Sequence, residues 1–215
     1  MILLASVLVL LVLLVVLDRV AVAYADNQAA QQMKSQGFPI KPNVSIEGFP
    51  FLTQVAARRL NDVHVTASHV QEGPVTLSLV ADATGVLLNP GFQSGTITHV
   101  TGTGLIGFSN LASVAGVSGA PGLKITAAGS NRVKIDINLQ IVDASAIAAI
   151  ERTGPDTFKV RIVSTNGIPA QLIGSLKSFT VHIPALPMGL SIQGVTVSSQ
   201  GVVIHVSGSN IKFHQ

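Results

Sequence analysis

The first seventeen residues form an apolar run that constrains this chain more than any other feature. Between Met1 and Leu17 only Ser6 is polar. A helix of this length spans ~25 Å, close to the ~30 Å hydrocarbon core of a bilayer. Helices in the core of soluble proteins rarely carry such an unbroken apolar surface. The run therefore predicts a segment that takes the chain to or across a membrane.

Two outcomes are open for this segment. Ala23-Tyr24-Ala25, before Asp26, matches the small-x-small pattern of a signal peptidase site. Alternatively, the helix continues as far as Met33 and is retained as an anchor. No Lys or Arg precedes the apolar run, which is unlike a signal peptide and favours retention. We expect a signal or transmembrane anchor segment at 1–25, a helix end and connector at 26–42, and a β-rich domain at 43–215.

The composition narrows the class of protein. Only 11% of the residues are charged and 4% are aromatic, so the apolar content is mainly Val, Ile, Leu and Ala. Branched aliphatic side chains favour strands. The net charge of +3 comes without a basic cluster longer than Arg58-Arg59, which argues against nucleic-acid binding. The chain has no cysteine, which excludes disulfides, thiolate catalysis and cysteine-ligated metals.

Alternating apolar and polar residues predict amphipathic strands in the second half of the chain. Such alternation leaves one dry face and one wet face on each strand. The clearest apolar series is Val133, Ile135, Ile137, Leu139 and Ile141, and shorter ones lie in 158–162, 179–183 and 202–206.

Segments of about a dozen residues with helical spacing separate several of these strands. The clearest are Phe49–Leu60 and Phe108–Ser118. We predict an α+β fold in which short helices accompany a long antiparallel sheet. The apolar face of that sheet either curls on itself, wraps a helix, or is available to a ligand.

No catalytic or metal-binding pattern emerges from the sequence. Gly102-x-Gly104-x-x-Gly107 matches a dinucleotide fingerprint, but no acidic residue follows at the required distance, so the glycines indicate a bent strand. The six histidines show no metal-ligand spacing, the acids are scattered, and no nucleophile elbow occurs. We therefore expect no enzyme activity, no cofactor and no metal. An envelope hydrolase or transferase remains a minor alternative.

The most distinctive string is Gly48-Phe49-Pro50-Phe51-Leu52-Thr53-Gln54. As structure, it ends a strand and starts a helix at Pro50. As function, its apolar side chains line the mouth of an apolar cavity. With the preceding Pro42-Asn43-Val44, the string resembles the signature of the LmeA family of phospholipid-binding proteins of actinobacterial cell envelopes. Asp18-Arg19-Val20-Ala21 and the tail from Leu186-Pro187-Met188-Gly189-Leu190 to Gly201-Val202 are also similar to the family pattern.

The resemblance implies an exported or membrane-anchored, extracytoplasmic protein with a TULIP-like fold, a long curved sheet wrapped around a helix. It implies binding of a phospholipid or another envelope lipid and a link to envelope glycolipid or mannan maturation. The alternative is a structural or accessory protein that binds an envelope biosynthetic enzyme and carries no lipid. The predicted lipid contacts are Phe49, Phe51, Leu52, Phe108, Leu111, Ile135, Ile137 and Leu139.

Overall fold

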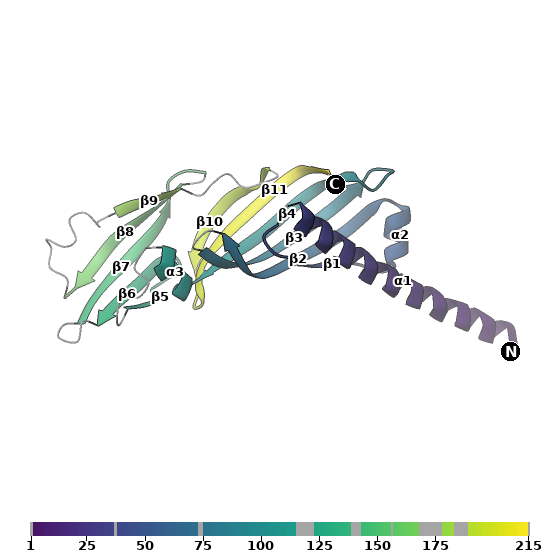
Figure 1. The fold of residues 1–215 in the computed structure, drawn as a ribbon, viewed down its shortest axis with the longest axis horizontal. Helices are drawn as coiled ribbons and strands as arrows, with labels where there is room; N and C mark the ends of the chain where they lie inside the picture. Colours follow the sequence, from purple (N-terminus) through teal and green to yellow (C-terminus); the bar gives the residue numbers. More distant parts are fainter. Residues whose placement is uncertain are drawn as a thin grey trace. The chain divides into compact units, whose positions relative to one another are not determined.

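The computed structural model describes residues 2–36, 38–72, 75–114, 123–138, 143–155, 157–167, 178–182 and 189–214. It is an α+β protein that begins with a long helix and continues as two antiparallel sheets (Figure 1). The predicted fold class is confirmed, although the strands divide between two sheets where the sequence indicated one. Contacts group the chain into unit 1, Met1–Ser68, Val80–Thr101 and Gly208–Gln215, and unit 2, His69–Leu79 and Gly102–Ser207.

The first sheet has six strands in the order β1-β2-β3-β4-β11-β10. Its long strands pass from one unit into the other. In β1 and β2, Val44 lies opposite Val65 and Ile46 opposite Val63. The bounds are β1 Asn43–Glu47, β2 Arg59–Glu72, β3 Val75–Leu88, β4 Ser94–Gly107, β10 Ser191–Val197 and β11 Gly201–His214.

The second sheet has five strands in the order β5-β6-β7-β8-β9 and belongs to unit 2. The alternating series of the sequence forms β6, in which Ile135 lies opposite Ile125 and Ile137 opposite Leu123. Leu139 and Ile141 lie outside the described residues. The bounds are β5 Leu123–Ala127, β6 Arg132–Asn138, β7 Asp143–Arg152, β8 Thr157–Asn166 and β9 Ser178–His182.

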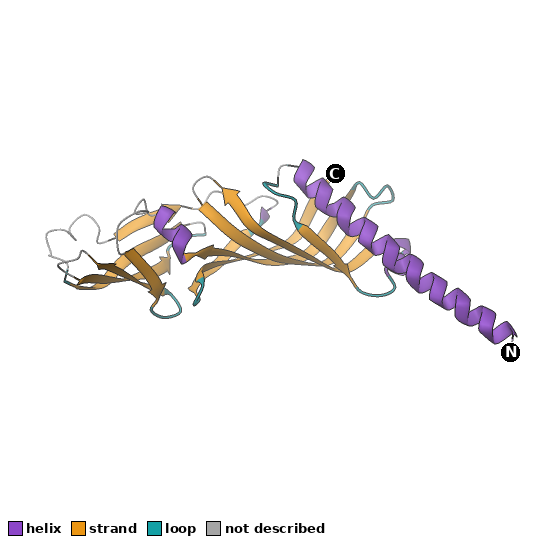
Figure 2. Cartoon of the chain, turned by 60° about the horizontal axis from the view of Figure 1, so that its bottom comes forward, coloured by secondary structure: helices purple, strands orange, loops and turns teal. Residues whose placement is uncertain are grey.

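The long helix α1, Ile2–Ser35, supplies part of the core of unit 1. Its Val22 is buried in one cluster with Ile46, Leu60 and Val86 from three neighbouring strands, and Ala21 and Ala25 pack against the same cluster. Figure 2 shows the later part of α1 lying along the sheet. The helix thus continues through Ala25 without a break. Its second half is a structural part of the domain.

The first half of α1 has a different environment. From Leu3 to Leu17 the large apolar side chains are exposed, Leu3 by 82% and Leu17 by 50%. By length and composition, this is the one helix among the described residues that is able to cross a membrane. The segment is therefore suited to be an anchor or a signal sequence.

The core of unit 2 joins both sheets. Val133 and Ala148 of the second sheet are buried in one cluster with Val197 and Val202 of the first. The backbone N–H of Val197 donates to the Ser130 carbonyl oxygen at 2.6 Å. The short helix α3, Phe108–Val114, follows β4 directly and packs two of its apolar side chains on this cluster.

Candidate functional site

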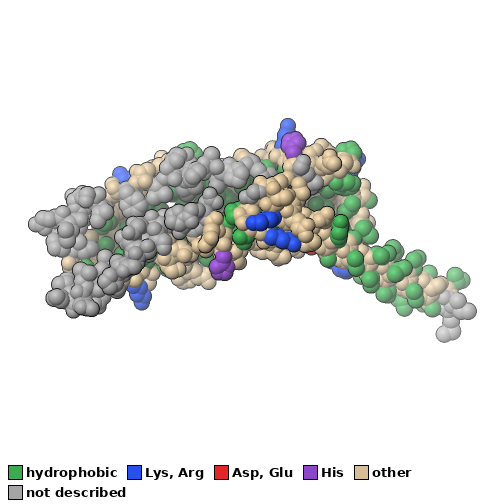
Figure 3. Space-filling model, in the orientation of Figure 1, with side chains coloured by type: hydrophobic (Ala, Val, Ile, Leu, Met, Phe, Trp, Pro, Cys, Tyr) green, Lys and Arg blue, Asp and Glu red, His purple; other side chains and the backbone are tan. Residues whose placement is uncertain are grey.

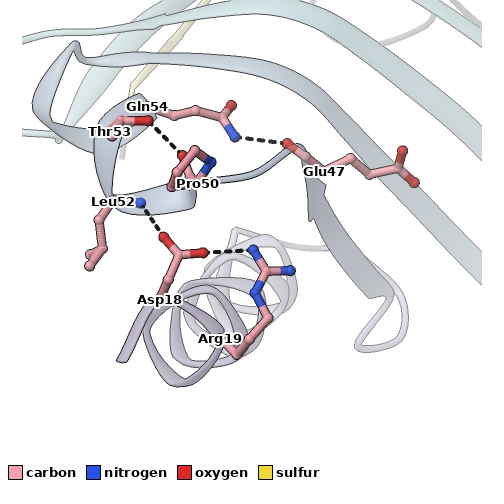
Figure 4. A network of polar contacts seen from close by, with 7 residues as sticks. All are labelled: Asp18, Arg19, Glu47, Pro50, Leu52, Thr53 and Gln54. Carbon is pink, nitrogen blue, oxygen red and sulfur yellow. Dashed lines mark hydrogen bonds and ion pairs between the residues drawn. The ribbon is translucent and has the colours of Figure 1, made fainter. Parts of the chain in front are cut away.

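A polar joint fixes α1 to the turn that carries the distinctive string. Asp18 is 2% exposed, and its Oδ1 accepts a hydrogen bond of 2.8 Å from the backbone N–H of Leu52. Its other oxygen accepts one of 2.6 Å from Arg19 Nη2 (Figure 4). Leu52 belongs to the six-residue helix α2, Phe51–Ala56. Asp18 therefore satisfies a backbone donor in the first turn of α2 that no intrahelical acceptor can reach.

The string itself builds the turn from β1 to β2. The buried Gln54 side chain donates to the Glu47 carbonyl oxygen at 3.0 Å and accepts from the Asn61 backbone N–H at 2.9 Å. Gly48 has φ +95°, and a Cβ there would lie 2.7 Å from Gln54 Nε2. Only glycine combines this backbone with this approach. The Phe49–Pro50 peptide bond is cis.

The three apolar side chains of the string have separate environments. Phe51 is 5% exposed and belongs to the core of unit 1. Phe49 and Leu52 are 62% and 43% exposed. Arg19 stacks over Phe49, with Cζ 5.1 Å from the ring centroid, a cation–π geometry. A role for these residues in holding lipid stays a prediction.

A second carboxylate reinforces the joint. Asp26 Oδ1 accepts a hydrogen bond of 2.8 Å from the Ile46 backbone N–H. Burial raises the pKa of Asp26, against the effect of that hydrogen bond. Burial alone would also raise the pKa of Asp18, but the hydrogen bonds from Leu52 and Arg19 outweigh it and hold the pKa below its ordinary value. Asp18 is thus bound as a carboxylate.

Cross-strand polar pairs identify the outer face of the first sheet. His99 Nδ1 lies 3.2 Å from Ser209 Oγ across β4 and β11, so these two exposed residues share a face. Thr196 Oγ1 lies 2.8 Å from His205 Nε2 across β10 and β11, on that same face. The outer face also carries Thr103 and Ser207, together with the apolar Leu105 and Val203. Between Val100 and Ile106 of β4 and between Val202 and Val206 of β11, the even positions therefore point to the opposite, inner face.

The inner face is apolar in unit 2. A Cβ added to Gly104 would meet a single side chain within 4 Å, at 3.4 Å from Leu79 Cδ2, so Gly104 and Leu79 share this face. Alternation adds the other members. All are half-buried, unlike the buried core cluster of unit 1. We call them the inner-face patch: Leu77, Leu79, Gly104, Ile106, Ile204 and Val206.

The remaining predicted lipid contacts belong to unit 2. Phe108 and Leu111 of α3 are half-buried and pack on its core cluster. Ile135 is half-buried on β6, and Ile137 lies two positions further along the same strand. Leu139 lies outside the described residues. The structure thus places those predicted residues that it describes in two groups, one in each unit, and their contact with lipid stays a prediction.

The pattern Gly102-x-Gly104-x-x-Gly107 lies within β4, as expected of glycines in a strand, and α3 begins directly after it. Across the described ranges, no three His, Asp or Glu side chains converge as metal ligands. His64 Nδ1 lies 2.5 Å from Asp82 Oδ1 on neighbouring strands β2 and β3.

A long apolar helix, a sheet that packs on it and a half-buried aliphatic face are typical of lipid-binding proteins. The model of the LmeA-like phospholipid-binding family matches residues 16–207. The chain belongs to this family, as its resemblance predicted. The match begins just before Asp18 and so includes the part of α1 that packs in unit 1. No curated protein and no solved structure matches the chain.

Proposed function

We propose that this protein holds phospholipid at the extracytoplasmic surface of the cell membrane, with the acyl chains on the inner-face patch. The observation that carries the proposal is the patch itself: aliphatic side chains on neighbouring strands that remain half-buried, in a member of a phospholipid-binding family. Covering this surface with acyl chains contributes ~25 cal/mol for each Å² removed from water. A binding role without catalysis accounts for these features.

The geometry of β3 and β4 suits an extended hydrocarbon chain. Gly104 has no side chain, so the surface of the patch is recessed beside Leu79. An acyl chain laid there contacts Leu79 on one flank and the aliphatic side chains of β11 on the other. The further contacts that the sequence predicts within the same unit are Phe108, Leu111, Ile135, Ile137 and Leu139.

The joint between α1 and the domain supports a retained anchor. Cleavage after Ala25 removes Asp18, which binds the Leu52 N–H, and Val22, which is 9% exposed in the core. Retention preserves both. The apolar run 2–17 then holds the domain at the membrane that supplies its lipid, where it can serve envelope glycolipid or mannan maturation.

The test compares two glycine substitutions in the full chain. Gly104→Leu fills the patch, whereas Gly91→Leu adds the same side chain at a turn where a Cβ meets nothing within 4 Å. Native mass spectrometry after release from detergent measures the phospholipid that each retains. We expect Gly104→Leu to lower occupancy about tenfold, the effect of ~1.4 kcal/mol of lost contact, with Gly91→Leu unchanged.

Circular dichroism and the thermal midpoint report whether Gly104→Leu remains folded. Gly104→Ala serves as a milder variant, because its Cβ meets Leu79 at an ordinary contact distance of 3.4 Å. Equal lipid occupancy in folded Gly104→Leu and Gly91→Leu contradicts the patch as the binding surface. Absence of phospholipid from the unsubstituted chain favours the alternative, an accessory protein for an envelope enzyme.

A further inference from the structure

We infer that the exposed side of the β1–α2 turn is a membrane-surface contact, in which Phe49 and Leu52 enter the interface of the leaflet that holds α1. The inference rests on the anchorage part of the proposed function. It assigns to this turn a partner, the phospholipid bilayer surface, that is distinct from a lipid molecule bound on the inner-face patch.

The turn divides its apolar side chains between two environments. Phe51 and Gln54 point into unit 1 and are 5% and 7% exposed. Phe49 and Leu52, from the same seven-residue string, are exposed by 62% and 43%. Phe49 is more exposed than any large apolar side chain described outside α1. The inward pair packs in the core of unit 1, whereas the outward pair leaves apolar surface exposed, with Arg19 stacked over Phe49.

The joint fixes the height of these side chains along α1. Asp18 follows the apolar run directly, and its carboxylate holds the Leu52 N–H at 2.8 Å. Arg19 Cζ lies 5.1 Å from the Phe49 ring. Both outward side chains therefore flank α1 at the level where the run 2–17 ends. Figure 3 shows apolar side chains distributed along the exposed part of this helix.

The length of the run places this level at the membrane interface. Residues 2–17 span ~24 Å as a helix, less than the ~30 Å hydrocarbon core. Because the run is shorter than the core, its C-terminal end is drawn toward the hydrocarbon. Asp18 and the α2 turn then lie at the depth of the lipid headgroups. Aromatic side chains are favoured at this depth, and an arginine beside them extends to lipid phosphates.

The exposed arginines at the turn suit an anionic leaflet, although Glu47 and Asp62, opposite each other on β1 and β2, are exposed as well. The Arg19 side chain is 50% exposed, and its neighbour Asp18 is buried with 3% exposure. The positive group is therefore presented outward while its counter-ion is turned inward. Arg58 and Arg59 follow α2 and are exposed as well. Such groups attract a surface of anionic phospholipid.

Single tryptophans test the inference, because the chain contains none of its own. Phe49→Trp and Leu52→Trp report from the turn. Val163→Trp, at an apolar position of β8 that is 37% exposed, is the matched control. Each full-length variant is reconstituted into vesicles of phosphatidylcholine and phosphatidylglycerol, with or without brominated acyl chains. Co-flotation with the vesicles measures anchorage independently of the fluorescence.

We expect blue-shifted emission at positions 49 and 52 and quenching by shallow bromines that exceeds the Val163→Trp value about twofold or more. Equal quenching at all three positions in chains that float with the vesicles overturns the inference and leaves anchorage standing. A chain that does not float overturns both, whereas lipid capture on the patch is measured separately by mass spectrometry. A blue shift without vesicles that grows with protein concentration assigns the turn to a second copy and overturns the membrane contact.

Discussion

Asp18 on α1 binds the backbone N–H of Leu52, 34 residues further along the chain, at 2.8 Å. The bond connects the end of the apolar run to the first turn of α2 and leaves the Asp18 carboxylate almost without solvent contact. The segment 1–25, which the sequence predicts to be a signal or transmembrane anchor, therefore contributes a residue to the folded domain. The residues just after the run therefore affect the stability of unit 1.

Two truncations test this integration. A chain that starts at Asp18 keeps the joint and Val22, whereas one that starts at Asp26 loses both. Burial of a valine side chain contributes ~1.5–3 kcal/mol. We expect the shorter chain to melt at least ~5 °C lower, measured by circular dichroism. Equal melting temperatures would show that the first part of α1 adds nothing to the fold and would favour cleavage after Ala25.

Substitution of Asp18 tests the joint without truncation. Asp18→Asn keeps the shape of the side chain but replaces the carboxylate, whose two oxygens accept hydrogen bonds from Leu52 and Arg19, with a neutral amide. We expect a lower melting temperature and faster proteolysis between α1 and the domain. Asp62→Asn, at an exposed carboxylate of β2, is the control and should behave as the unsubstituted chain. The same loss in both variants would contradict a specific role for Asp18.

The acid dependence follows from the same bond. The pKa of Asp18 is lowered on folding from its ordinary 3.8, so its carboxylate contributes stability that is fully present above pH ~4 and lost as the pH falls through the folded pKa. The melting-temperature gap between the unsubstituted chain and Asp18→Asn should therefore narrow in acid. Asp26 shifts oppositely but is present in both chains and cancels. A gap that widens below pH 4 refutes this assignment.

The local patterns of the sequence predicted a substantial part of the fold. Alternation identified β6 and β8, and helical spacing identified α2 and α3. β7 lacks this signal, since its Ala144, Ala146, Ala148 and Ala149 carry buried methyl groups on both faces. The division into two sheets depends on pairing between distant strands, which local pattern does not encode.

The candidate site was predicted less completely. Leu77 and Leu79 alternate with polar neighbours in β3, which is a detectable strand signal. That they lie beside Gly104 depends on the pairing of β3 with β4, which only the structure shows. Asp18 carried no local signal, because its partner is a backbone N–H of another element. The family resemblance included both segments without indicating that they touch.

The two phenylalanines of the string should respond differently to truncation. Phe51→Ala empties a position in the core of unit 1, a change that costs ~3–5 kcal/mol. Phe49→Ala removes a ring that is 62% exposed and should cost less than ~1 kcal/mol. Urea denaturation of the full chain in detergent measures both. Similar losses would mean that Phe49 also packs in the core.

Gly48 should tolerate no side chain, although the residue is exposed to solvent. At φ +95° an L-residue is strained by ~1–3 kcal/mol, and the added Cβ would lie 2.7 Å from Gln54 Nε2. Gln54 cannot move aside freely, because it bridges the Glu47 carbonyl and the Asn61 N–H. We expect Gly48→Ala to lower the free energy of unfolding by at least ~1 kcal/mol. Gly91→Ala, which meets nothing within 4 Å, is the control, and a loss at Gly48 no larger than at Gly91 would contradict the geometry of the turn.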